Sequence, residues 1–247
     1  MGDKILTMIK VIELPIDKDM GGLTSYVLQL YRMIDKKEFE LTLLSYDNPQ
    51  NFDVNYNVET VSRPYHIIKK MKCLLSEEKD IIHFHQSYVN IIPILIAKLA
   101  GFKTIILHAH SSSIDDNRKI IRFLKTGLHK VGRFLLPYLV DTYIGCSTKA
   151  SEWMFPRKCI DSDSYYLLHN AIDLDLYDRN INLGLEVRQK FNIPKDALVV
   201  GHIGRFTPVK NHPFIIDIFK EVLKQNPNSY LFLLGDGVER HKIESLV

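Results

Sequence analysis

The chain has 247 residues, of which 46% are hydrophobic and 25% are charged. This balance is typical of a globular protein and argues against a disordered or membrane-spanning chain. The formal net charge of +3 is too small for a dedicated nucleic-acid-binding protein, although it suits anionic ligands or an anionic membrane surface.

In the first two thirds of the chain, short β-branched and apolar runs alternate with longer segments of helical periodicity. The predicted strands lie near residues 7–14, 41–46, 81–85, 104–108, 141–146 and 165–168. The predicted helices lie near residues 23–33, 65–75, 89–99, 118–136 and 148–154. This alternation predicts an α/β fold with a doubly wound parallel sheet.

After residue 173 the sequence becomes polar, and the β/α order then starts again. A short helix precedes a predicted strand at 197–203, a helix at 213–224, a strand at 230–234 and a Gly-Asp-Gly turn that opens a helix at 238. We therefore predict a first domain at 1–175, and a linker with the first part of a second Rossmann-like domain at 176–247.

Gly21 and Gly22 follow the first predicted strand and open a helix. Two residues without Cβ let a ligand approach the backbone, and the helix N-terminal amides favour a phosphate there. The spacing is not that of a dinucleotide-binding G-x-G-x-x-G motif. A plain structural turn is the alternative.

Four histidines end two neighbouring predicted strands, at the sheet edge where α/β proteins bind ligands. We expect His83 and His108 to be hydrogen-bonded within the sheet, and His85 and His110, further along their strands, to meet a substrate hydroxyl. A zinc site is the alternative. Because no Glu or Cys completes a convincing ligand set in the sequence, we expect no metal ion.

Arg205 and Lys210 lie in the segment that leaves the first strand of the second domain and enters a helix. A guanidinium fork, an ammonium group and helix N-terminal amides together suit a diphosphate. Solvated surface is the alternative for such a pair.

The segment 118–133 contains six basic residues and no acid, interleaved with apolar residues. Such a segment suits an anionic membrane surface. A solvated basic face above a packed apolar face is equally compatible with the pattern.

Three widely spaced cysteines, without a C-x-x-C pair, favour a reducing compartment. The N-terminus shows no secretion or lipidation signal, and the apolar runs are far shorter than the about 20 residues that span a bilayer. We expect a cytoplasmic protein, with association on the cytoplasmic membrane face as a further expectation.

Several short motifs, taken in order, carry a family resemblance along the whole chain. They are Gly21-Gly22, the segments 81–87 and 108–112, Cys146-Ser147-Thr148-Lys149-Ala150, His169-Asn170-Ala171-Ile172-Asp173, Gly204-Arg205-Phe206 with Lys210-Asn211, and residues 233–237. In these motifs the chain resembles the retaining glycosyltransferases of family 4, which have the GT-B fold, and among them bacterial enzymes of exopolysaccharide and capsule assembly.

The resemblance implies donor-binding roles for Gly21, Gly22, Arg205, Lys210 and Asn211. Arg205 and Lys210 would hold the donor diphosphate and stabilise its departure.

The resemblance also implies a catalytic position for His110, in contact with the transferred sugar. Contacts of His85 and Asn170 with the acceptor or sugar are weaker implications. No metal and no cofactor are implied, because the nucleotide-sugar is a substrate.

The implied activity is transfer of a sugar from a UDP- or GDP-sugar to a lipid-linked or growing saccharide, with retention, and without a nucleic-acid partner. Two alternatives remain, a truncated non-catalytic GT-B-like binding protein and a nucleotide-sugar epimerase of the same fold. The paired-glutamate motif of the family does not occur before Val247, so we expect the 247-residue form to be inactive.

Overall fold

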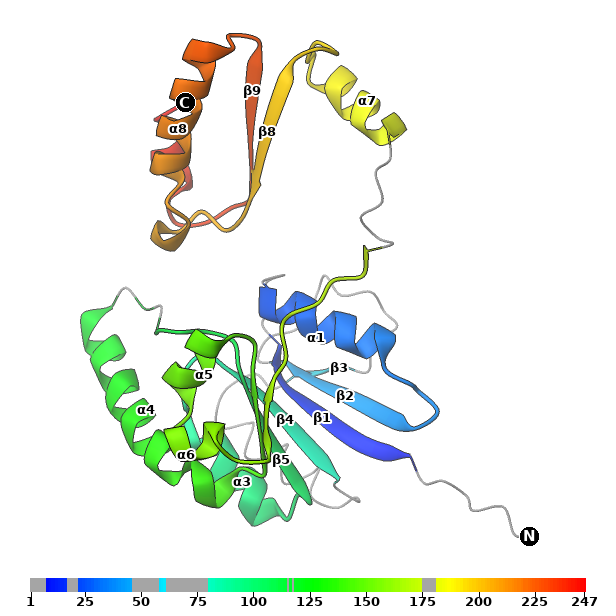
Figure 1. Cartoon of the computed structure of the whole chain (residues 1–247), viewed down its shortest axis with the longest axis vertical. Helices are drawn as coiled ribbons and strands as arrows, with labels where there is room; N and C mark the ends of the chain where they lie inside the picture. Colours follow the sequence, from blue (N-terminus) through cyan, green and yellow to red (C-terminus); the bar gives the residue numbers. More distant parts are fainter. Residues whose placement is uncertain are drawn as a thin grey trace. The chain divides into compact units, whose positions relative to one another are not determined.

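The computed structural model describes residues 8–16, 22–45, 58–60, 80–114, 116, 118–174 and 181–247. The chain divides into two compact units, Met1–Asp173 and Leu174–Val247. Each unit is built from parallel strands with helices between them (Figure 1).

The first unit has seven strands and five helices in its described part. The strands are β1 (Ile9–Ile16), β2 (Phe39–Ser45), β3 (Val58–Thr60), β4 (Ile81–Gln86), β5 (Thr104–Ala109), β6 (Thr142–Gly145) and β7 (Tyr165–Leu167). The helices are α1 (Gly22–Met33), α3 (Ile91–Ala100), α4 (Lys119–Leu139), α5 (Thr148–Met154) and α6 (Arg157–Ile160).

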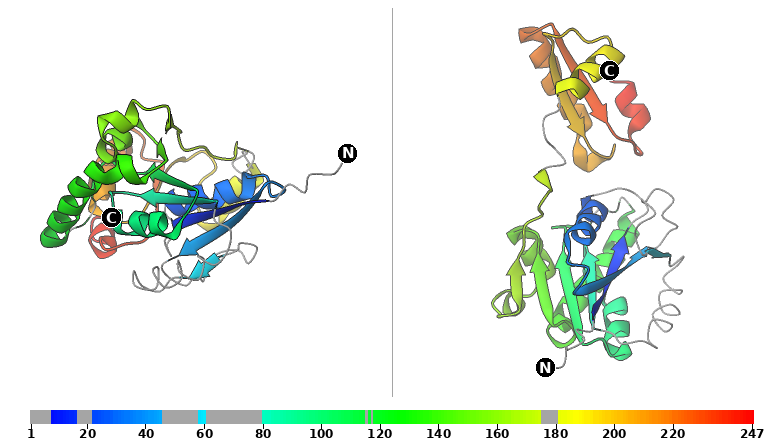
Figure 2. Two further views of the ribbon diagram at one scale, coloured as in Figure 1. Left: turned by 90° about the horizontal axis from the view of Figure 1, so that it is seen from below. Right: turned by 90° about the vertical axis from the view of Figure 1, so that its right-hand side faces the viewer.

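The seven strands form one sheet in the order β3-β2-β1-β4-β5-β6-β7, and all described pairings are parallel. Figure 2 shows the central strands side by side and pointing the same way. The strand order reverses between β1 and β4, and the crevice at the carboxyl ends of these two strands is the usual ligand position in doubly wound folds.

The two faces of this sheet pack against different helices. One face is apolar and carries alternate residues such as Phe84 and Leu107, which are fully buried in the main hydrophobic core. On the other face Leu43 packs with Val27 and Leu28 of α1 in a smaller cluster. Helix α1 therefore covers one face, and α3 to α6 lie on the other side (Figure 1).

The predicted doubly wound sheet is observed, and most element boundaries agree within about three residues. Strand β3 and helix α6 were not predicted, because segments of three and four residues are too short to show a periodicity. The predicted helix at 65–75 lies outside the described residues.

The second unit contains α7 (Ile181–Lys190), β8 (Leu198–Ile203), the 3-10 turn η2 (Pro208–Lys210), α8 (His212–Gln225), β9 (Ser229–Leu234) and α9 (Arg240–Glu244). Strands β8 and β9 pair in parallel along their whole length. Phe206, Ile216 and Ile243 form the buried apolar cluster of this unit. Helix α9 begins at Arg240, two residues after the predicted start.

His129 of α4 joins this helix to the segment that precedes α3. Its Nδ1 accepts a hydrogen bond of 3.0 Å from the backbone N–H of Val89, and its ring stacks on Trp153 at a centroid distance of 4.2 Å. Burial, followed by the nearby Arg133, lowers the pKa of His129 to about 4. Protonation would also remove the lone pair that accepts the Val89 hydrogen bond.

We predict that His129 makes the first unit less stable in acid. The folded pKa lies below the unfolded value of about 6.5, so the unfolded chain binds the proton first, and stability falls as the pH drops from 6.5 towards 4. At pH 5 this loss is about 2 kcal/mol. Urea unfolding at pH 7.5 and 5 should show a smaller pH dependence for His129→Gln than for the wild type, and equal dependence would contradict the assignment.

Candidate functional site

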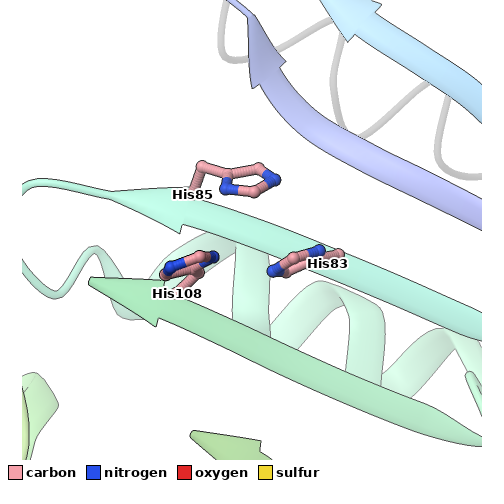
Figure 3. A group of neighbouring side chains, drawn as sticks. All are labelled: His83, His85 and His108. Atoms are coloured by element: carbon pink, nitrogen blue, oxygen red, sulfur yellow. The ribbon is translucent and has the colours of Figure 1, made fainter. Parts of the chain in front are cut away.

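A polar cluster lies on the α1 face of the sheet, at the switch point between β1 and β4. In the strand register Glu13 stands opposite His83, and His85 stands opposite His108. Residues two apart on a strand share a face, so β4 contributes two imidazoles and β5 contributes His108 and, just beyond its end, His110. Figure 3 shows the rings of His83, His85 and His108 gathered on the same side of the two strands.

The Glu13 carboxylate connects two of the histidines. Glu13 Oε2 lies 2.6 Å from His85 Nε2 and 3.0 Å from His83 Nδ1, so each ring donates an N–H to the carboxylate. His85 Nδ1 in turn lies 2.8 Å from His110 Nε2. These contacts form a chain of hydrogen bonds from the buried acid to the half-buried His110.

The cluster is ionised at Glu13 and neutral at the histidines whose pKa is shifted. Burial alone would raise the pKa of Glu13, but His83 and His85 outweigh burial and lower it. Burial, followed by repulsion from His83, lowers the pKa of His85 to about 4. Burial, followed by repulsion from His85, lowers the pKa of His110 to about 3, and burial also lowers that of His108. His110 can therefore offer a neutral ring to a sugar hydroxyl at pH 7.

Tyr26 of α1 packs over the cluster from the neighbouring helix. Its ring centroid lies 5.3 Å from that of His108, 5.4 Å from His110 and 6.0 Å from His85. Both Tyr26 and His110 are half-buried, whereas His85 and His108 are buried. His110 and Tyr26 are thus the part of the cluster that a ligand would meet first.

Two expectations about these histidines need correction. His85 was expected to stand out along its strand, but it is only 1% exposed and is hydrogen-bonded to Glu13 and His110. His108 was expected to be hydrogen-bonded within the sheet, but neither of its ring nitrogens has a partner among the described residues. Sequence reasoning also missed Glu13, which comes from β1 and satisfies both His83 and His85.

The structure describes two of the other candidates of the first unit, Gly22 and Asn170. Gly22 begins α1, and among the described residues no atom lies within 4 Å of the position that a Cβ would take there. Gly21 lies outside the described residues. Asn170 is exposed three residues after β7, two strands away from β5 in the sheet.

In the second unit, the segment 204–211 leaves the carboxyl end of β8 and leads into α8. Arg205, Lys210 and Asn211 are all exposed. A Cβ at Gly204 would lie 3.5 Å from Lys210 Cε, so the lysine stem folds back over the end of the strand. Asn211 has a left-handed backbone with φ of 50°, which turns the chain into α8. Arg205 and Lys210 thus both belong to the exposed segment that leads into the first turn of α8.

The loop after β9 holds this segment in place. Gly204 N–H donates to Leu234 O at 2.9 Å, and Phe206 N–H donates to Asp236 O at 2.8 Å. Gly235 and Gly237 have φ of +153° and +156°, and a Cβ on either would collide with the backbone of the 204–206 segment. Two strand ends are therefore bound into one backbone platform at the carboxyl edge of the β8–β9 sheet, which is the ligand edge of such sheets.

Helix α4 presents a third candidate surface. Six apolar side chains on it are between 60% and 78% exposed, namely Ile120, Phe123, Leu124, Val131, Phe134 and Tyr138. At about 100° per residue these positions share one face, and the buried His129, Gly132 and Leu136 lie on the opposite face.

Two exposed basic residues, Lys119 and Lys130, border the apolar face of α4, and Arg122 is exposed nearer the opposite side of the helix. Arg118 and Lys125 both pair with Asp116, at 3.0 Å and 2.9 Å. Asp116, just before the segment 118–133, therefore offsets part of its positive charge. The net positive charge of this surface is smaller than the six basic residues suggest. None of the described helices is long and apolar enough to cross a membrane.

Comparison with known proteins identifies the family. The sequence model of Glycosyltransferase Family 4 matches residues 20–176, and that of Glycosyl transferases group 1 matches residues 185–247. A Bacillus subtilis protein described as a glycosyltransferase, EpsF, is 25% identical over 92% of this chain and 62% of its own length. The Escherichia coli UDP-Gal:alpha-D-GlcNAc-diphosphoundecaprenol alpha-1,3-galactosyltransferase is 22% identical over 93% of this chain and 62% of its own length.

Among solved structures, Anabaena Alr3699/HepE in complex with UDP and glucose superposes with a TM-score of 0.72 at 14% identity, over 97% of this chain and 65% of that one. This likeness confirms the predicted GT-B type of fold, with a Rossmann-like first domain and part of a second. The chain spans about 62% of the length of the curated relatives named above. The match of the first family model over more than half of the residues settles the classification: the chain belongs to Glycosyltransferase Family 4.

Proposed function

We propose that the protein transfers a sugar from a UDP- or GDP-sugar to a lipid-linked or growing saccharide acceptor, with retention, in the synthesis of a surface polysaccharide. The observation that carries this proposal is the platform after β8, where Arg205 and Lys210 project from a backbone fixed by the β9 loop. The activity for which the Escherichia coli relative is named, with a UDP-sugar donor and a diphosphoundecaprenol-linked acceptor, supports the same class of substrates.

The two units take different parts in this proposal. Residues 176–247 would hold the donor, with Arg205 and Lys210 on the diphosphate and Asn211 beside them. Residues 1–175 would form the acceptor side, with Gly21 and Gly22 near the donor phosphates and His110 at the transferred sugar. The two cations would stabilise the charge that develops as the nucleoside diphosphate leaves, and such electrostatic stabilisation is a large term in enzymatic catalysis.

An epimerase of the same fold is the competing activity. A UDP-GlcNAc 2-epimerase from Neisseria meningitidis superposes with a TM-score of 0.55, which indicates a shared fold alone. Incubation with UDP- and GDP-sugars, with and without a polyprenyl-diphosphate-linked sugar, separates the two activities. A transferase releases the nucleoside diphosphate only when the acceptor is present, whereas an epimerase converts or releases the sugar without it.

We further propose that the exposed apolar face of α4 binds the surface of an anionic membrane. A water-soluble helix normally turns its apolar face inward, but here the apolar face lies opposite the buried one. Lys119 and Lys130, which border this face, supply the charge complementary to anionic lipid head groups. This surface would hold the acceptor side of the protein near a lipid-linked acceptor.

The membrane proposal predicts that Phe123→Ser with Phe134→Ser weakens binding to vesicles of phosphatidylglycerol and phosphatidylcholine. Withdrawing two aromatic side chains from the lipid should lower the affinity more than about 100-fold, since each fully buried side chain contributes about 1.5 to 3 kcal/mol and two are removed. Binding by the wild type should also weaken with added salt, because the Debye length is only about 8 Å at physiological ionic strength.

A matched control is Leu99→Ser, which removes a leucine that is 88% exposed on α3, outside the apolar face of α4. Co-sedimentation of this variant should equal that of the wild type. If the wild type does not sediment with anionic vesicles at low salt, or if the double variant sediments equally well, the apolar face of α4 does not bind an anionic membrane and the proposal is wrong.

A further inference from the structure

The buried histidines on β4 and β5 contain ring nitrogens that no described group satisfies. His83 Nε2 and both ring nitrogens of His108 are buried and have no hydrogen-bond partner in the part of the chain that the structure describes. His108 is fully buried and His83 is 6% exposed. Because buried polar atoms in folded proteins are almost always bonded, three such nitrogens in one cluster point to a ligand that binds imidazole.

The spacing of the rings fits a metal ion. One ring nitrogen from each of His83, His85 and His108 lies within 4.8 Å of the other two (Figure 3). Three nitrogens at about 2.1 Å from a tetrahedral ion would be about 3.4 Å apart, so the ring nitrogens that lie within 4.8 Å of one another need to converge by about 1.4 Å at most. Rotation of the imidazoles about their side-chain bonds provides movements of this size without a change in the strands.

Glu13 determines which nitrogens carry lone pairs. Because the carboxylate accepts the N–H of His83 Nδ1 and of His85 Nε2, the unprotonated nitrogens are His83 Nε2 and His85 Nδ1. Metal-binding histidines commonly donate their other ring N–H to a carboxylate in this way, which fixes the tautomer and the ring orientation. His85 Nδ1 now faces His110 Nε2 at 2.8 Å, and a bound ion would take the place of that hydrogen bond.

We propose that His83, His85 and His108 bind one Zn²⁺ ion or a similar divalent transition-metal ion, with Glu13 as the positioning residue for two of the rings. Three imidazoles favour this class of ion over Mg²⁺ or Ca²⁺, which prefer oxygen ligands. The ion would join β4 to β5, and through Glu13 it would join both strands to β1. A bound ion would also free the half-buried His110 imidazole from its hydrogen bond to His85.

The sequence favoured the opposite expectation, that the four histidines bind no metal, because no Glu or Cys stood near them. The carboxylate comes instead from β1, which precedes His83 by about 70 residues in the chain and pairs with β4 in the sheet. The proposal concerns the first unit alone and does not depend on the proposed transferase activity.

The test titrates the chelator-treated protein with Zn²⁺ in competition with a chromophoric chelator, and with Co²⁺ as a spectroscopic probe. We expect one equivalent of ion per chain, intense visible Co²⁺ bands of tetrahedral coordination, and a rise in the unfolding temperature with bound ion. His83→Gln and His108→Gln should each lower the affinity more than about 100-fold. Glu13→Gln should lower it about 10- to 100-fold, the range for loss of a carboxylate that orients a ligand.

His212→Gln is the matched control, because His212 is also fully buried with two unpartnered ring nitrogens among the described residues, but lies in the second unit. It should bind the ion like the wild type, and circular dichroism should show that each variant is folded. If His108→Gln does not fold, the affinities of the His83 and Glu13 variants and the stoichiometry of the wild type still show whether the ion binds at this site. Absence of stoichiometric binding by the wild type, or unchanged affinity in folded His83→Gln, would overturn the proposal.

Discussion

Replacing Arg205 or Lys210 by alanine should lower the affinity of the protein that contains this chain for UDP or GDP about 10- to 150-fold. A charge-assisted hydrogen bond to phosphate contributes about 1.5 to 3 kcal/mol, and each 1.4 kcal/mol corresponds to a tenfold change in affinity. Both side chains are exposed at the carboxyl edge of β8, so their removal leaves the Phe206 cluster of the second unit intact. Isothermal titration calorimetry with each nucleotide measures the effect.

Lys195→Ala provides the control, because Lys195 is an exposed cation just before β8, at the opposite end of the same strand. Its nucleotide affinity should equal that of the wild type. Arg205→Lys should give an intermediate loss, since an ammonium group keeps the charge but not the bidentate fork of the guanidinium. Equal affinities for the wild type and both alanine variants would remove the donor site from this loop.

Replacing His110 by alanine should lower kcat about 100-fold while the Kd for UDP or GDP changes by no more than about twofold. In the protein without a bound ion, the imidazole is half-buried at the end of the hydrogen-bond chain from Glu13 through His85, and its lowered pKa keeps it neutral above pH 4. A neutral ring held in this way can bind a sugar hydroxyl in the transition state, and the expected loss of about 100-fold corresponds to about 2.7 kcal/mol of transition-state stabilisation.

The variant also leaves His85 Nδ1 without its partner, so a structural effect must be separated from loss of the sugar contact. His110→Gln keeps a hydrogen-bonding group at the position and should recover part of the lost kcat. Its unfolding temperature and that of His110→Ala should be compared with the wild type. An unchanged kcat in folded His110→Ala would restrict His110 to a structural role.

The sequence predicted the helices and strands in which apolar residues recur with a clear periodicity. It also predicted that ligands bind at the carboxyl ends of the strands. In 81–86 the two histidines alternate with apolar residues, and His108 and His110 lie two residues apart at the end of the apolar run 104–109, so the shared face of the histidines followed from a period of two. The same reasoning located the exposed Arg205 and Lys210 after β8.

The chemistry inside the histidine cluster was not predicted, because it depends on which strands are neighbours. Glu13 is an acid between the apolar residues Ile12 and Leu14 of a predicted strand, and this was the available signal, since a buried carboxylate needs a partner. Only the order β1-β4-β5 shows that its partners are His83 and His85. Burial of His85 likewise follows from Tyr26 and His110 packing beside it, which no pattern within β4 reveals.

The measurement that tests the proposed function most directly follows donor consumption by NMR in the presence and absence of a polyprenyl-diphosphate-linked acceptor. The protein that contains this chain should release UDP or GDP from one of a panel of nucleotide-sugars only when the acceptor is present. The new glycosidic linkage should keep the anomeric configuration of the donor. Epimerisation or sugar release without the acceptor, or a product of inverted configuration, would contradict the account.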